Sequence, residues 1–199
     1  MNKKVSIIDY NTGNIRSVIN AISKFNVDVF LTDNHNKILQ SDAIVLPGVG
    51  SFSYGMYNLR QKKLERVIHK FVDSGKPVLG ICLGMQLMME SSSEFGNTSG
   101  LCLFEGAVEK LPDNSGFLVP HIGWEGVKFS GSEQEEDFFF CHSYVAVPKN
   151  TNEIYATTLC SNYRFCSAIK RENVVGYQFH PEKSSKSGVK LIQSFVEKI

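Results

Sequence analysis

One strand–turn–helix stretch near the middle of this 199-residue chain constrains its fold more than any other feature. The residues Val78–Ile81 are mostly apolar and predict a short buried strand. Cys82 follows at once, and apolar residues at helical spacing over 83–90 predict a helix that begins directly after it. Gly80 and Gly84 flank the cysteine symmetrically, which is the pattern of a strained turn that presents a nucleophile at a helix N-terminus. This stretch therefore predicts a reactive cysteine above one edge of a sheet.

The same pattern has a plainer interpretation. A free cysteine is among the most buried residue types, so Cys82 could be a packing residue at the end of a strand. The flanking glycines favour the nucleophile, because a tight turn needs positions that are nearly free of side chains. The decision depends on whether the chain also supplies a base.

The first half of the chain alternates short apolar strands with amphipathic helices. This order predicts an α/β fold with a mostly parallel central sheet covered on both faces. Ligands of such sheets bind outside the carboxyl ends of the strands, where Cys82 and the loop at 47–50 both lie. Strands are expected at 5–8, 27–31, 43–46 and 78–81, and helices at 15–25, 33–40 (capped by Asp33) and 64–72.

The second half of the chain changes character. Short strands separated by turns predict additional antiparallel pairs, and residues 189–199 predict a C-terminal helix packed on the sheet. Residues 91–100 and 131–137 are polar and are expected as loops. We expect one domain over 1–199. The later strands are expected at 108–111, 127–129, 138–142, 154–158, 165–169 and 174–179.

Charge and hydropathy exclude several classes of function. The net charge is +1 and no block of Lys and Arg is present, so neither nucleic acid nor a membrane surface is an expected partner. No apolar run approaches the roughly 20 residues that span a bilayer. The N-terminus runs directly into a strand and lacks the apolar core of a secretion signal, so we expect a cytoplasmic protein.

The five cysteines show no pairing pattern. Their number is odd and no two have Cys-x-x-Cys spacing, which argues against a disulfide framework and a zinc ribbon. Cys102, Cys141, Cys160 and Cys166 are expected to be small apolar residues in or near strands. No metal-ligand cluster or nucleotide-binding loop is apparent, so no metal and no cofactor are expected.

A candidate base follows the late strand that ends near residue 179. His180 and Glu182 are two residues apart, so their side chains project to one side of an extended chain, and Pro181 stiffens the turn between them. A carboxylate placed in this way could hold the imidazole in the tautomer that accepts a thiol proton. Alone, such a pair is usually a surface feature, but together with the Cys82 turn it indicates a Cys-His-Glu triad.

The chain resembles the class I glutamine amidotransferases, which use such a triad, and the resemblance implies their three-layer, flavodoxin-like α/β fold with additional antiparallel strands. The resemblance covers nearly the whole chain and rests on GICLGMQ at 80–86 and QFHPE at 178–182. Within the class, the motifs resemble the glutaminase subunits of imidazole glycerol phosphate synthase. The segments that carry this finer resemblance are PGVG at 47–50, PHIGW at 120–124, HSY at 142–144 and HPEKS at 180–184.

The resemblance implies a role for each matching residue. Cys82 would attack the side-chain amide of L-glutamine, His180 would act as general acid and base, and Glu182 would orient His180. An oxyanion hole would be formed by the backbone N–H of Leu83 and one from the Gly48–Val49 loop. The family's glutamine-binding positions match Gly50, Gln86, His142, Ser143 and Tyr144, and its partner-facing positions match Asn14, Trp124 and Lys183.

Two of these residues have ordinary alternatives. His142 could simply be a hydrogen-bonded strand histidine. Trp124 could belong to the core instead of an interface.

The resemblance also implies a pathway and a partner. Ammonia from glutamine would pass to a cyclase subunit of (β/α)8-barrel fold in a heterodimer that makes imidazole glycerol phosphate and AICAR in histidine biosynthesis. Departures from the subfamily pattern leave an alternative open, namely a paralogue that feeds ammonia to another synthase, such as one forming an amidine on a surface sugar. The departures are Glu125 in place of Asn, Phe139-Phe140-Cys141 in place of Tyr-Phe-Val, and the lack of a Tyr-Gly pair near Cys160. A non-catalytic scaffold and a cysteine peptidase of related fold are the remaining alternatives.

Overall fold

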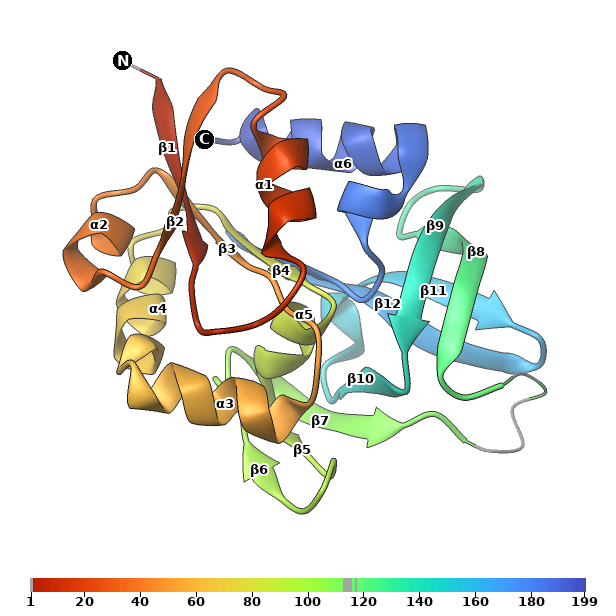
Figure 1. The fold of residues 1–199 in the computed structure, drawn as a ribbon. Coiled ribbons are helices and arrows are strands. Elements are labelled where there is room, and N and C mark those ends of the chain that lie inside the picture. Colours follow the sequence, from red (N-terminus) through yellow and green to blue (C-terminus); the bar gives the residue numbers. More distant parts are fainter. Residues whose placement is uncertain (1, 113–115, 117) are drawn as a thin grey trace.

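The computed structural model describes residues 2–112, 116 and 118–199. Its centre is a nine-stranded sheet (Figure 1). The strands of this sheet are β1 (Lys3–Ile8), β2 (Val27–Thr32), β3 (Ala43–Leu46), β4 (Val78–Ile81), β8 (His121–Phe129), β9 (Glu135–His142), β11 (Ile154–Cys160), β12 (Tyr163–Arg171) and β13 (Val174–Tyr177).

The sheet changes from parallel to antiparallel at one strand. Its order is β2-β1-β3-β4-β13-β12-β11-β8-β9. The strands from β2 to β13 in this order pair in parallel. From β13 to β9 every pairing is antiparallel. The predicted α/β fold, with a parallel sheet extended by antiparallel strands, is therefore confirmed.

Helices cover both faces of this sheet. On one face lie α1 (Ile15–Ile22) and α6 (Ser185–Val196), whose apolar residues share a core with the strands. The opposite face has its own apolar core, to which the other four helices contribute. These helices are α2 (His35–Leu39), α3 (Phe52–Gln61), α4 (Leu64–Asp73) and α5 (Leu83–Leu87), and the 3₁₀ helices are η1 (Thr151–Glu153) and η2 (Pro181–Lys183).

A second, smaller sheet packs under the α3 and α5 side of the molecule (Figure 1). It has the strand order β10-β7-β5-β6. These strands are β5 (Met89–Ser92), β6 (Thr98–Ser99), β7 (Phe104–Lys110) and β10 (Tyr144–Pro148). The sheet matters for function because β10 begins at Tyr144, within the predicted glutamine-binding segment.

The structure differs from the sequence-based expectation in several elements. The helix after Cys82 ends at Leu87 rather than reaching Glu90, because the chain reverses there and Leu101 donates its N–H to the Leu87 carbonyl. Glu90 lies in β5. The sequence pattern also missed α3 and β10, and residues 135–137 of the expected acidic loop belong to β9.

The start of α2 also differs from expectation. Asn34, and not Asp33, is its N-cap, and the Asn34 side chain accepts a hydrogen bond from the Lys37 N–H. Asp33 instead forms an ion pair with Lys62 at 3.1 Å. No helix among the described residues is both long enough and apolar enough to cross a membrane.

Candidate active site

Cys82 occupies the strained turn that the flanking glycines predict. It lies between β4 and α5 with φ 52° and ψ −110°, a region that non-glycine residues rarely adopt. A Cβ on Gly84 would collide with the Leu46 carbonyl, and one on Gly80 would lie 2.9 Å from the Met85 backbone nitrogen. Both flanking positions therefore exclude side chains, and the turn has the geometry of a nucleophile elbow.

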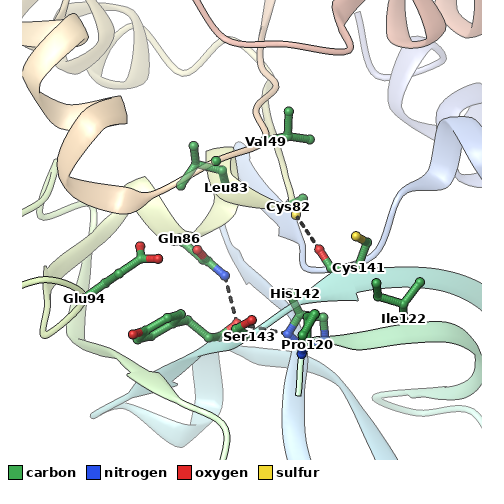
Figure 2. Close-up of a pocket in the computed structure, with 12 residues that line it drawn as sticks. Val49, Cys82, Leu83, Gln86, Glu94, Pro120, Ile122, Cys141, His142 and Ser143 are labelled. Carbon is green, nitrogen blue, oxygen red and sulfur yellow. Dashed lines mark hydrogen bonds between the residues drawn. The ribbon is translucent and has the colours of Figure 1, made fainter. Parts of the chain in front are cut away.

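The cysteine opens into a cavity at the carboxyl end of the parallel strands. The cavity has a volume of about 240 Å³ (Figure 2), which suits a small polar metabolite. All five of the predicted glutamine-binding residues line it. The lining residues are Val49, Gly50, Cys82, Leu83, Gln86, Glu94, Pro120, Ile122, Cys141, His142, Ser143 and Tyr144.

His180 and Glu182 form the predicted pair beside Cys82. His180 Nδ1 lies 2.8 Å from Glu182 Oε1, and the side chains are 3% and 1% exposed. The His180 backbone is fixed as well, because its N–H donates to the Phe139 carbonyl at 2.9 Å and its carbonyl accepts the Ser184 hydroxyl at 2.6 Å. The imidazole therefore has one defined orientation.

Charge at this site favours a protonated imidazole. Burial lowers the pKa of His180, but hydrogen bonds and charge interactions with Cys82 and Glu182 outweigh burial and raise it to about 10. At neutral pH His180 is therefore an imidazolium beside the sulfur. Gln178 adds a further donor, with its Nε2 at 3.8 Å from Cys82 Sγ, so the surroundings stabilise negative charge on the sulfur.

The predicted oxyanion hole is closed in this conformation. The Leu83 N–H donates to the Gly48 carbonyl at 3.3 Å, so one of the two expected donors is already occupied. The loop before it is held by Tyr10, whose hydroxyl donates to the Pro47 carbonyl. The Gly48–Val49 peptide therefore presents an acceptor at the place where catalysis needs a donor.

Gln86 and His142 form the polar floor of the cavity. Gln86 Nε2 donates to the Tyr144 carbonyl at 2.8 Å and to Gln178 Oε1 at 3.0 Å, and His142 Nδ1 lies 3.0 Å from the same Tyr144 carbonyl. Burial lowers the pKa of His142 to about 3, so this ring is neutral. The hydrogen bonds fix Gln86, His142 and the start of β10 as one unit, which leaves the Ser143–Tyr144 segment on the cavity wall.

Glu94 also lines the cavity, although the sequence patterns did not single it out. Its Oε2 accepts the Phe52 N–H at 2.6 Å, at the N-terminus of α3, and Figure 2 places it on the side of the cavity away from Ile122. A carboxylate there is oriented by the helix end and faces the space. Its position in a polar stretch without periodicity gave no signal, because only the three-dimensional fold brings it to the pocket.

The residues predicted to face a partner lie in two places near the triad. Trp124 is half-exposed and packs edge-on against Phe139 at 6.1 Å between ring centroids, and the Lys183 ammonium lies 5.7 Å from the same ring. Asn14 lines a separate small cavity that Glu182 also borders. None of these three side chains lines the cavity beside Cys82.

A second group contains the same three residue types. His121, Glu125 and Cys160 lie close to one another, and Glu125 turns away from Trp124 to meet them. Burial, with the Glu125 carboxylate in support, raises the pKa of the Cys160 thiol to about 12. Cys160 is thus a neutral thiol and does not line the cavity, which makes it a poor nucleophile compared with Cys82.

The remaining cysteines only partly meet expectation. Cys160 and Cys166 are buried in strands as predicted, whereas Cys102 and Cys141 are exposed. Cys141 borders the cavity, and its carbonyl lies 3.9 Å from Cys82 Sγ. Side-chain alternation along β9 explains its exposure, because Phe140 and His142 occupy the buried face.

Comparison with known proteins agrees with this geometry. Residues 6–199 match the family described as glutamine amidotransferase class-I. A solved structure described as a glutamine amidotransferase superposes with a TM-score of 0.77 at 16% identity, covering 97% of this chain and 98% of that one. PurLQS from Thermotoga maritima gives a TM-score of 0.73 at 19% identity, covering 99% and 98%. The chain belongs to the class-I glutamine amidotransferase family.

Curated relatives narrow the assignment within that family. Each of the following is named imidazole glycerol phosphate synthase subunit HisH, and at this identity over nearly full length the chain groups with them. The Listeria innocua protein is 41% identical over 97% of this chain and 95% of its own. The Moorella thermoacetica protein is 40% identical over 98% and 95%, and the Aquifex aeolicus protein is 41% identical over 96% and 95%.

Proposed function

We propose that this chain is the glutaminase subunit of an imidazole glycerol phosphate synthase, with Cys82 as nucleophile. The observation that supports this most directly is the strained Cys82 at the mouth of the cavity, next to the His180–Glu182 pair. The substrate is L-glutamine and the products are glutamate and ammonia.

The reaction proceeds through a thioester. Cys82 sulfur attacks the side-chain amide carbon, and the resulting oxyanion collapses as His180 gives its proton to the leaving ammonia. His180 then accepts a proton from water, which attacks the thioester carbonyl and releases glutamate and the thiolate. Glu182 holds the imidazole in place through both steps.

Both charged groups on the α-carbon of glutamine are bound. The Ser143–Tyr144 segment, which Gln86 and His142 fix through the Tyr144 carbonyl, presents its backbone to the α-carboxylate. Glu94 receives the α-ammonium group on the opposite side. A small pocket with a few placed polar groups of this kind selects an amino acid with a short side-chain amide.

The acceptor of ammonia is a cyclase subunit of (β/α)8-barrel fold, bound as a heterodimer. Trp124, Lys183 and Asn14 face it around the triad, so ammonia released at Cys82 leaves toward the partner. The names of the curated relatives, subunits of imidazole glycerol phosphate synthase, support a partner subunit, and the family resemblance supports its barrel fold.

The isolated chain should be a poor glutaminase that its partner activates. Activation requires the Gly48–Val49 peptide to rotate, so that the Val49 N–H replaces the Gly48 carbonyl and the Leu83 N–H becomes available. One oxyanion donor changes kcat by roughly 10²–10³, so the cyclase should raise kcat by at least about 100-fold. Steady-state ammonia release with and without the cyclase measures this, and full activity of the chain alone would contradict the proposal.

Glu94→Gln should weaken glutamine binding while leaving the chemical step nearly intact. The amide keeps an oxygen for the Phe52 N–H but removes the charge opposite the ammonium group. A hydrogen bond to a charged group is worth about 1.5–3 kcal/mol, so KM should rise roughly 10- to 150-fold with little change in kcat. Glu133→Gln, which changes an exposed carboxylate that does not line the cavity, is the matched control. Equal KM values for the two variants would show that Glu94 does not bind the ammonium group of glutamine.

A further inference from the structure

The His121, Glu125 and Cys160 group stands apart from the glutamine pocket and has no part in the proposed reaction. His121 Nε2 lies 3.3 Å from Glu125 Oε1 and 3.6 Å from Cys160 Sγ, and that sulfur lies 3.2 Å from Glu125 Oε1. Three different donor atoms thus meet at one point. His121 and Cys160 are buried, and the Glu125 side chain is 30% exposed.

Strand geometry explains why these residues meet. His121 and Glu125 are four apart in β8, so both side chains lie on one face of the strand. Gly123 lies between them on that face, and a Cβ there would meet nothing within 4 Å. β11 pairs with β8, and continuing their register from Thr158↔Val127 brings Cys160 opposite Glu125. The sheet therefore holds all three side chains over one open position.

The hydrogen bonds around His121 show which of its two ring nitrogens carries the proton and which one points at Glu125 as an acceptor. The neutral His142 donates from Nδ1 to the Tyr144 carbonyl, so its Nε2 accepts, and the donor 3.3 Å away is His121 Nδ1. A neutral His121 then directs the lone pair of Nε2 at the Glu125 carboxylate. The Cys160 thiol donates to the same Glu125 oxygen at 3.2 Å, so a metal ion that replaced this proton would have all three atoms directed at it.

The spacing of the donor atoms matches a tetrahedral metal ion. Bonds of about 2.3 Å to sulfur and about 2.0–2.2 Å to nitrogen and oxygen put tetrahedral donor atoms roughly 3.3–3.6 Å apart. The observed separations run from 3.2 to 3.6 Å. We propose that His121 Nε2, Glu125 Oε1 and Cys160 Sγ form a zinc site.

Charge and access suit Zn²⁺ in particular. Binding displaces the thiol proton to solvent, so a dication meets one thiolate and one carboxylate and the largely buried site is neutral. Mixed nitrogen, oxygen and sulfur donors are the borderline-soft set that zinc accepts. The exposed part of Glu125 leaves room for water as a fourth ligand.

The site is connected to the glutamine pocket through one hydrogen bond. His121 donates its other ring nitrogen to His142, as metal-bound histidines ordinarily do to a neighbouring acceptor. His142 in turn shares the Tyr144 carbonyl with Gln86. A bound metal would therefore fix His121 and, through it, His142 in the wall of the pocket, without contacting the substrate.

A cobalt titration tests the proposal without relying on activity. Because Cys82 and His180 could themselves bind a metal, the parent protein carries Cys82→Ser, and it is stripped with a chelator before Co²⁺ is added. We expect one Co²⁺ per chain, with the intense thiolate-to-cobalt absorption of a tetrahedral site, and competition by Zn²⁺. Adding Cys160→Ser should abolish the thiolate band. Glu125→Gln should weaken Zn²⁺ affinity at least about tenfold, since even second-shell changes cost ~10–100-fold.

Two controls distinguish metal binding at this site from binding elsewhere on the chain. Adding Cys102→Ser, at an exposed cysteine outside the group, should leave both the band and the affinity unchanged. Zinc should also raise the melting temperature of the parent but not of its Cys160→Ser derivative. No stoichiometric binding, or a band that survives Cys160→Ser, would overturn the proposal. Either result leaves the glutaminase proposal untouched.

Discussion

Cys82→Ala should reduce partner-activated glutamine hydrolysis by roughly four to six orders of magnitude, because loss of a covalent nucleophile removes the whole acylation route. Cys82→Ser should be almost as inactive, since a hydroxyl is far less acidic than a thiol and the imidazolium has no anion to pair with. The measurement is ammonia release in the presence of the cyclase. Unchanged circular dichroism and partner binding should accompany the loss.

Covalent labelling gives an independent reading of the same residue. A glutamine-like diazo ketone should modify wild-type protein once per chain, at Cys82, as peptide mass spectrometry would show. Cys102→Ser, at an exposed cysteine that does not line the cavity, should label as wild type does. Stoichiometric labelling of Cys82→Ala would mean that another thiol is the nucleophile, and Cys141, which also borders the cavity, would then be the first to examine.

Gly84→Ala should cost more stability than any other single-methyl change in the turn. The added Cβ would overlap the Leu46 carbonyl, which belongs to β3 backbone and cannot turn aside. Overpacking of this kind costs about 3 kcal/mol or more, which lowers the melting temperature by roughly 6–12 °C in a chain of this size. Glutaminase activity should also fall in the fraction of protein that stays folded. The added methyl group forces α5 to shift, and this displaces the Leu83 N–H from the oxyanion hole.

Gly123→Ala is the matched control for this substitution. Its added methyl group meets nothing within 4 Å, and alanine is compatible with the strand backbone of β8. The change in melting temperature should be within a degree or two, corresponding to about 0.5 kcal/mol. If both variants have the same melting temperature, the collision with the Leu46 carbonyl is not the reason that this position requires glycine.

The sequence was informative where local chemistry determines structure. The glycines around Cys82 predicted the strained turn because no other residue fits there, and the spacing of His180 and Glu182 predicted their contact. β3 and β4 were predicted with correct bounds because short, fully apolar runs between turns have few alternatives.

Tertiary contacts decided the rest. The helix after Cys82 is cut short because Leu101 and Gly100 bond to the backbone of residues 87 and 90, which no local pattern reveals. Glu94 reaches the pocket only because α3 presents a backbone N–H to it. The expectation that no metal ligands cluster rested on spacing along the chain, whereas Cys160 meets His121 across paired strands.

The pairing of β4 with β13, where the parallel part of the sheet meets the antiparallel part, determines when during synthesis the active site becomes complete. Cys82 leaves β4 and His180 leaves β13, and these strands are in register, with the Cys82 N–H donating to the Tyr177 carbonyl at 2.7 Å. During translation, β4 therefore emerges from the ribosome long before the strand that completes its edge. Until residues 174–182 follow, the nascent chain holds a thiol without its base and an open apolar edge. An incomplete chain therefore does not hydrolyse glutamine. The unpaired edge of β4 is where stalled chains would aggregate.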